Sequence, residues 1–257
     1  RGGVGSDDDW AELSEEEIRA EEDAQFEAAS KAATAPVTDP TARVLFEKEK
    51  TLLDRMTAIA EGARALPDAR VRKLVDWIRE NMCPDLPPLG RGPSPGTAAK
   101  WNDVRLLIFT EYDDTKRYLR EQLTAAISGT DRAEERIEVF HGPTPLPKRE
   151  EIKRAFNADP AKHPLRILIA TDAAREGLNL QARCWNLFHL DVPWNPSRLE
   201  QRNGRIDRKL QPRPAVHCHY FFYAQRKEDR ILSTLVRKTH IIKRALGCLA
   251  QVLEGRL

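Results

Sequence analysis

In the first part of the chain, apolar residues recur three or four positions apart. This spacing predicts a long amphipathic helix over residues 40–66 and a second helix over 68–81. Asp39 and Pro40 mark the start of the first helix, because a capping carboxylate followed by proline suits a first turn. Pro67 separates the two helices, since proline does not fit inside a helix.

From Trp101 onward, the pattern changes to short apolar runs separated by helical patterns. The runs predict five strands, at residues 104–109, 137–140, 165–170, 185–190 and 216–222. The helical patterns lie at residues 115–127, 146–156 and 227–253. This alternation predicts an α/β fold, a parallel sheet flanked by helices. The carboxyl ends of parallel strands share one edge, where ligands usually bind, so polar residues just after the strands are the functional candidates.

Composition divides the chain into four parts. Residues 1–37 form an acidic arm, which we expect to be partly disordered or helical, since residues 1–35 hold eleven acids and three bases, a sum of −8. The other parts are a linker helix at 38–67, the main lobe at 68–225 with a loop rich in proline and glycine at 83–100, and a C-terminal helix at 226–257.

Charge and cysteine content exclude several classes of protein. The 42 basic and 40 acidic residues leave a net charge of +2, so the chain is not a histone-like polycation. No apolar run approaches the roughly 18 residues that cross a bilayer. The four cysteines lie far apart without zinc-site spacing, so we expect free thiols in a reducing compartment. The chain begins at Arg1 without a secretory leader, and we expect a fragment of a cytoplasmic bacterial protein.

Three blocks of polar residues follow the predicted strands. Thr110 follows the first strand, the sequence TDAAREGLNL occupies 171–180, and PWNPSRLEQRNGRIDR occupies 193–208. In this order the blocks resemble motifs IV, V and VI of superfamily 2 helicases and translocases, whereas one motif alone would be a weak signal. They are most similar to the Swi/Snf-related ATPases, in particular to a bacterial branch that includes an RNA-polymerase-associated recycling factor and anti-phage defence helicases.

The resemblance implies that the chain is the C-terminal RecA-like lobe of a two-lobe motor. It implies that Arg205 and Arg208 are catalytic arginine fingers, which act on a nucleotide bound between the lobes. The other residues that it places at the nucleotide are Glu176, Gly177, Asn179, Gln201 and Arg202. The residues that it places at the nucleic acid are Thr110, His141, Gly142, Thr171 and Asp172.

The chemistry of these residues supports the resemblance and leaves alternatives open. Arg205 and Arg208 are three positions apart, so on a helical turn they would share a face and reach a phosphate with two planar forks. The alternative is a solvated basic helix face. Thr171 with Asp172 also suits a helix cap, and Thr110 also suits a turn.

Three further features have two interpretations each. Glu176 either pairs with an arginine of the last block or is exposed. Trp194 either packs in the core or hinge, or stacks on a base. His217 and His219 alternate in a predicted strand, but two histidines make a weak metal site, so we expect a half-buried strand and no metal.

The phosphate-binding parts of such a motor are missing from the sequence. It contains no Gly-x-x-x-x-Gly-Lys-Ser/Thr loop and no Asp-Glu-x-His-like strand end. The resemblance therefore implies that ATP and Mg²⁺ are bound mainly by an N-terminal lobe of the same polypeptide. We expect DNA-dependent ATP hydrolysis only together with that lobe, and double-stranded DNA as the other partner. The alternatives are an RNA helicase lobe, a lobe that serves a restriction nuclease, and a docking module without activity.

Overall fold

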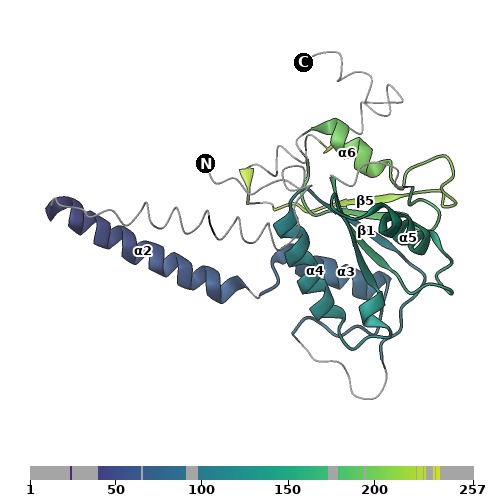
Figure 1. Cartoon of the computed structure of the whole chain (residues 1–257), viewed down its shortest axis with the longest axis horizontal. Coiled ribbons are helices and arrows are strands. Elements are labelled where there is room, and N and C mark those ends of the chain that lie inside the picture. The colour runs from purple at the N-terminus through teal and green to yellow at the C-terminus, as the bar shows by residue number, and fades with distance from the viewer. Residues whose placement is uncertain are drawn as a thin grey trace, which may run out of the picture. The chain divides into compact units, whose positions relative to one another are not determined.

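The structure is a computed structural model that describes residues 24, 40–64, 66–90, 98–172, 179–193, 195–223, 225–227, 229, 234 and 236–237. The chain divides into two compact units between Asp68 and Ala69. The first unit contains helix α2 (Pro40–Arg64), and the second contains the sheet and the remaining labelled helices (Figure 1).

Helix α2 confirms the first predicted helix, but its large apolar side chains lie at the surface. Leu45, Leu52 and Ile59 repeat every seven residues and are 63%, 56% and 70% exposed. Rows of exposed apolar side chains of this kind are typical of contact surfaces. Within the described part of the chain, no helix combines the length and the apolar character needed to cross a membrane.

Five parallel strands form the sheet, in the order β2–β3–β1–β4–β5. Their bounds are β1 Leu106–Thr110, β2 Ile137–Phe140, β3 Ile167–Thr171, β4 Asn186–His189 and β5 His217–Tyr220. Every residue of β1, β3 and β4 is buried, as expected for strands covered on both faces. The predicted α/β fold with a parallel sheet is confirmed, with small shifts at the strand ends.

Helices cover both faces of this sheet (Figure 1). Their bounds are α3 Ala69–Asn81, α4 Asp113–Ile127, α5 Leu146–Asn157 and α6 Pro196–Asn203, with a short 3-10 helix η1 at Ala133–Glu135. Successive residues of a strand point to opposite faces. Accordingly, α3 and α4 pack on the face that carries Ile108, and α5 packs on the face that carries Phe109. Helices α3, α4 and α5 confirm the corresponding sequence predictions.

Local signals in the sequence fix both ends of α6. Its N-cap is Asn195, whose side-chain oxygen accepts a hydrogen bond from Ser197 N at 2.9 Å, and Pro196 occupies the first turn. Gly204 ends the helix, and its N–H donates to Glu200 O at 2.8 Å. A Cβ at position 204 would lie 3.2 Å from that carbonyl oxygen, so glycine permits the close turn that follows.

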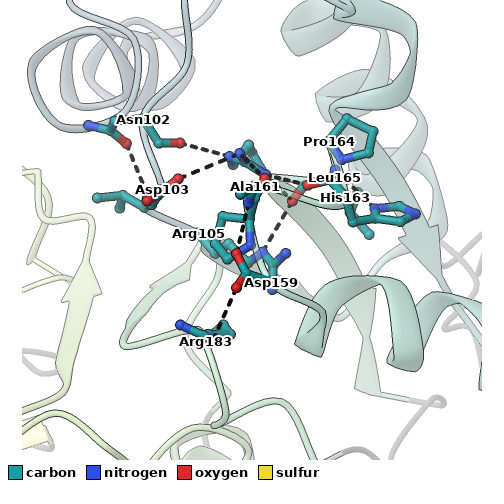
Figure 2. A network of polar contacts seen from close by, with 12 residues as sticks. Asn102, Asp103, Arg105, Asp159, Ala161, His163, Pro164, Leu165 and Arg183 are labelled. Carbon is teal, nitrogen blue, oxygen red and sulfur yellow. Dashed lines mark hydrogen bonds and ion pairs between the residues drawn. The ribbon is translucent and has the colours of Figure 1, made fainter.

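Buried arginines lie at the amino-terminal edge of the sheet. Arg105, Arg136 and Arg166 directly precede β1, β2 and β3. They donate mostly to backbone carbonyls, such as Arg105 Nε to Leu165 O at 3.2 Å and Arg166 Nε to Asn102 O at 2.7 Å. Figure 2 shows this network around Arg105. Because hydrogen bonds from charged groups are strong, the arginines hold the connecting loops to this edge of the sheet.

Several predictions from the sequence fall on residues that the structure does not describe. Within the acidic arm, residues 1–37, only Ala24 is described. Most of the last predicted helix, 227–253, also lies outside the described residues, as do residues 91–97 of the proline- and glycine-rich loop. The division into arm, linker helix, lobe and C-terminal helix stays a prediction.

Candidate nucleotide and nucleic-acid site

The predicted functional blocks follow the carboxyl ends of three neighbouring strands. Thr110 ends β1, Thr171 ends β3 and His189 ends β4, and β1 lies between the other two strands. The strand register pairs Thr110 directly with Thr171. The loops that follow these strands therefore start side by side at one edge of the sheet, as parallel pairing requires.

Arg202 of α6 lies at the centre of this edge and is 2% exposed. Its Nε and Nη2 donate to the two carboxylate oxygens of Asp172 at 2.6 and 2.8 Å. Its Nη1 donates to Asp191 O at 2.8 Å, and the guanidinium lies 5.5 Å from the ring centre of Phe109. Burial lowers the pKa of Arg202, but the bonds and charges of Asp172 and Asp191 outweigh burial and raise it above its ordinary value. Arg202 is therefore a permanent cation that holds α6 on the sheet.

Asp191, two residues after β4, links Arg202 to the loop after β1. Its carboxylate accepts from Arg202 Nη2 at 3.2 Å and from the Thr110 hydroxyl. The backbone N–H of Glu111 donates to both carboxylate oxygens, at 3.0 and 3.1 Å. Asp191 is not among the functional residues predicted from the sequence. The signal that could have found it was its position just past a buried strand, next to the last polar block.

This geometry gives four of the predicted side chains surroundings within the domain, and their expected roles at the ligands stay predictions. Thr110 and Thr171 are 0% exposed and Asp172 is 5% exposed, so these side chains are buried at the strand ends. Arg202 was expected to bind the nucleotide, but its guanidinium is buried and bound to two aspartates. The four residues support the loops at this edge, because their polar groups are used within the domain.

Arg205 and Arg208 follow the end of α6, close to the second polar block. The prediction that they share a helical turn is wrong, because α6 ends at Asn203 and a turn follows. Arg208 is exposed, and it donates through Nε to Gly204 O at 2.7 Å and through Nη1 to Asn179 Oδ1. The half-buried Arg205 accepts at its carbonyl from the N–H of Leu180 at 3.2 Å. The structure thus brings Asn179, Arg205 and Arg208 together.

The other residues expected at the nucleotide are placed only in part. Gln201 is exposed on α6, one residue before the buried Arg202. Glu176 and Gly177 lie outside the described residues, and so does Trp194. Their expected roles stay predictions.

His141 and Gly142 follow β2, next to a buried ion pair. Lys116 of α4 is 3% exposed, contacts the carboxylate of Asp113, and lies 3.2 Å from His141 Nδ1 through its Nζ. Since an ammonium only donates, Nδ1 is the acceptor, and the ring hydrogen belongs on Nε2. His141 also lines a cavity of about 230 Å³, together with Arg120 and Lys148. This part of the surface therefore combines basic side chains with the expected nucleic-acid loop.

His189 is a buried neutral base at the end of β4. Its Nε2 lies 2.8 Å from Asn203 Oδ1, and its ring stacks on Tyr220 at 4.7 Å between ring centres. Its Nδ1 has no hydrogen-bond partner within the described residues. Burial and the charge of Arg202 lower the pKa of His189 to about 3, although the bond with Asn203 opposes this shift. The folded protein therefore keeps His189 neutral at every pH near neutrality.

This burial predicts an acid-dependent loss of stability. The pKa of His189 is lowered from 6.5 to about 3 in the folded chain, so below pH 6.5 the unfolded chain binds a proton that the folded chain does not. We expect the free energy of unfolding to fall by about 1 kcal/mol per pH unit from this residue alone as pH decreases from 6.5 towards 3. Urea unfolding of wild type and His189→Gln at pH 7 and pH 5 measures this effect. An equal loss in both proteins would contradict the assignment.

Among the described residues, no group of three or more His, Cys, Asp or Glu side chains is arranged to hold a metal. Of the carboxylates at this edge, Asp172 and Asp191 bind Arg202, and Glu111 binds Arg198. The carboxylates described at this edge therefore do not fit a magnesium site. His217 is exposed, while His219 is half-buried and stacks on Phe188 at 4.2 Å, as expected for an edge strand.

Residues 99–209, which include the sheet edge with Asp172, Arg202 and Arg208, match the model of the helicase conserved C-terminal domain. This part of the chain is a helicase C-terminal domain. Three curated relatives extend the comparison. The uncharacterized ATP-dependent helicase YqhH of Bacillus subtilis (strain 168) is 35% identical over 203 residues, which cover 79% of this chain and 29% of that protein. The SNF2 domain-containing protein CLASSY 4 of Arabidopsis thaliana is 29% identical over 140 residues, which cover 51% of this chain and 12% of that protein.

The RNA polymerase-associated protein RapA of Yersinia enterocolitica (serotype O:8 / biotype 1B, strain NCTC 13174 / 8081) is 36% identical over 78 residues, which cover 30% of this chain and 8% of that protein. These matches confirm the predicted resemblance of this chain to the C-terminal lobe of Swi/Snf-related helicases. The chain spans less than a third of the length of each of these relatives.

Proposed function

We propose that this chain is the C-terminal motor lobe of an ATP-dependent DNA helicase or translocase of the Swi/Snf type. The observation that carries the proposal is the meeting of three ordered blocks at one edge of the sheet, with Arg205 and Arg208 just beyond α6. Relatives named as an ATP-dependent helicase and as a SNF2 domain-containing protein support it.

Arg208 and Arg205 are the groups that act on the nucleotide. Charge builds on the γ-phosphate oxygens during phosphoryl transfer, and planar guanidinium forks stabilise that charge. Arg208 is exposed and is oriented by Gly204 O and Asn179 Oδ1, so its position is set by two separate segments. ATP and Mg²⁺ are bound mainly by a second lobe, and the arginines act across the cleft between the lobes.

The nucleic-acid contacts come from exposed groups around the same edge. The hydroxyls of Thr110 and Thr171 are buried, so the direct contacts belong to Tyr112, which is 37% exposed after β1, and to the backbone of Gly142. The exposed Arg120 adds positive charge beside this loop. Aromatic rings and basic groups of this kind bind phosphates, sugars and bases.

The experiment that tests the proposal compares nucleic acids as activators. We expect duplex DNA to stimulate ATP hydrolysis by the full-length protein, and an RNA duplex of the same sequence to have little effect. Steady-state turnover is measured at saturating ATP against increasing nucleic acid. Stronger stimulation by RNA would identify an RNA helicase lobe, and no stimulation by either would leave the docking-module alternative.

A further inference from the structure

The carboxylate of Asp191 joins two loops that have separate proposed roles. On one side it accepts from the Thr110 hydroxyl and from Glu111 N, at the start of the loop that carries Tyr112. On the other side it accepts from Arg202 Nη2 at 3.2 Å, within α6. One short side chain therefore bridges the loop after β1 and the helix that leads to the two arginines.

The two aspartates that bind Arg202 differ in how firmly they hold it. Asp172 is 7% exposed as a side chain and makes two bonds, at 2.6 and 2.8 Å. Asp191 is 20% exposed and makes one longer carboxylate bond to Arg202, at 3.2 Å. Since paired, short, buried charged bonds are the strongest, Asp172 fixes Arg202 to β3. Asp191 also accepts from Arg202 Nη1 at its backbone oxygen, at 2.8 Å, so its carboxylate makes the longest of the four hydrogen bonds that hold Arg202.

A second bridge between the same two segments supports this interpretation. Arg198, one turn before Arg202 on α6, donates to Glu111 Oε1 at 3.0 Å. Residues four positions apart share a helix face, and from this face Arg198 reaches Glu111 while Arg202 reaches Asp172 and Asp191. The other end of α6 continues through Gly204 to the two arginines. The loop at Glu111 is therefore tied to α6 directly through Arg198 and indirectly through Asp191 and Arg202.

We infer that Asp191 is a positioning residue that couples nucleic-acid binding at the loop after β1 to the placement of Arg205 and Arg208. This inference rests on the proposed function. Contact of a DNA strand with the loop shifts the Glu111 N–H and the Thr110 hydroxyl, and Asp191 moves with them because it is bonded to both. The change at Arg202 then alters the position of α6. By linkage, a nucleotide that engages the arginines changes the affinity for DNA by the same factor.

The test uses Asp191→Asn in the full-length protein. The amide keeps the size of the carboxylate but replaces one acceptor oxygen with a donor, so it cannot accept from both sides as before. The coupling is measured as the ratio of the dissociation constants of a short DNA duplex without and with the ATP analogue AMPPNP. We expect this ratio to move about tenfold towards one, the size of an ordinary coupling between two sites. The ratio of DNA-stimulated to basal turnover falls in parallel.

Two further variants keep the result interpretable. Asp114→Asn removes the same charge from a nearby exposed position, where Asp114 forms an ion pair with Arg117, and we expect the wild-type ratio. Thr110→Val removes the hydroxyl that donates to Asp191 and keeps the shape of the side chain. We expect it to lower the coupling in part, and it tests the inference if Asp191→Asn folds poorly. A loss of stability alone would lower the fraction of binding-competent protein equally with and without AMPPNP. The ratio of the two dissociation constants would then stay unchanged.

The outcomes separate this inference from the proposed function. Wild-type protein that shows no DNA-dependent coupling to nucleotide overturns the proposed function, and the inference falls with it. Wild-type coupling that persists in both Asp191→Asn and Thr110→Val overturns the inference alone. Reduced coupling in these two variants with wild-type coupling in Asp114→Asn supports it.

Discussion

Arg205→Ala or Arg208→Ala in the full-length protein is expected to lower DNA-stimulated ATP hydrolysis by about 10³-fold or more. Removal of a guanidinium leaves the developing charge on the γ-phosphate without its partner. Both residues lie after the end of α6, and Arg208 is exposed while Arg205 is half-buried. The expected loss is therefore in turnover and not in folding.

A matched control is available on the same surface. Lys209 is exposed and directly follows Arg208, so Lys209→Ala removes one positive charge at nearly the same place. We expect near-normal turnover from Lys209→Ala and unchanged thermal unfolding from all three variants. Near-normal turnover in both arginine variants would contradict their catalytic role, whereas equal losses in all three would indicate a general charge effect.

Arg202→Met is expected to lower the free energy of unfolding of the chain by about 3–5 kcal/mol. The substitution keeps an apolar stem but leaves the carboxylates of Asp172 and Asp191 without the cation that binds both. Breaking a buried pair by removing one partner costs this much because the remaining charge stays buried. Urea unfolding followed by circular dichroism measures the change.

Two comparisons make this second prediction specific. Adding Asp172→Asn to Arg202→Met removes the stranded charge, so we expect part of the lost stability to return. Arg154→Met removes an exposed arginine from the surface of α5, and we expect a change within about 0.5 kcal/mol. An Arg202→Met protein as stable as wild type would show that the network does not hold α6 on the sheet.

The sheet was predictable because buried parallel strands have a plain sequence signature. Runs such as 167–170 are apolar throughout and are separated by helical patterns, so the strands and their parallel pairing could be inferred before any contact was known. The meeting of Thr110 and Thr171 at one edge followed from the same reasoning, because parallel strands end together.

The burial of Arg202 could not be predicted from its neighbours in sequence. Asp172 lies 30 positions away and Asp191 lies 11 positions away, so the contacts arise only after the strands have paired. The pattern Gln-Arg-Asn-Gly-Arg presents Arg202 and Arg205 as equivalent bases, yet one is 2% exposed and the other only half-buried. Local spacing also suggested one helical turn for Arg205 and Arg208, whereas Gly204 ends the helix before them.

The most direct test of the central claim separates ATP binding from the chemical step. Single-turnover hydrolysis and equilibrium ATP affinity are measured for wild-type and Arg208→Ala full-length protein, both saturated with duplex DNA. We expect an ATP affinity close to wild type and a rate of the chemical step about 10³-fold lower. An unchanged rate of the chemical step, with or without weaker ATP binding, would contradict the claim that Arg208 acts on the transferring phosphate.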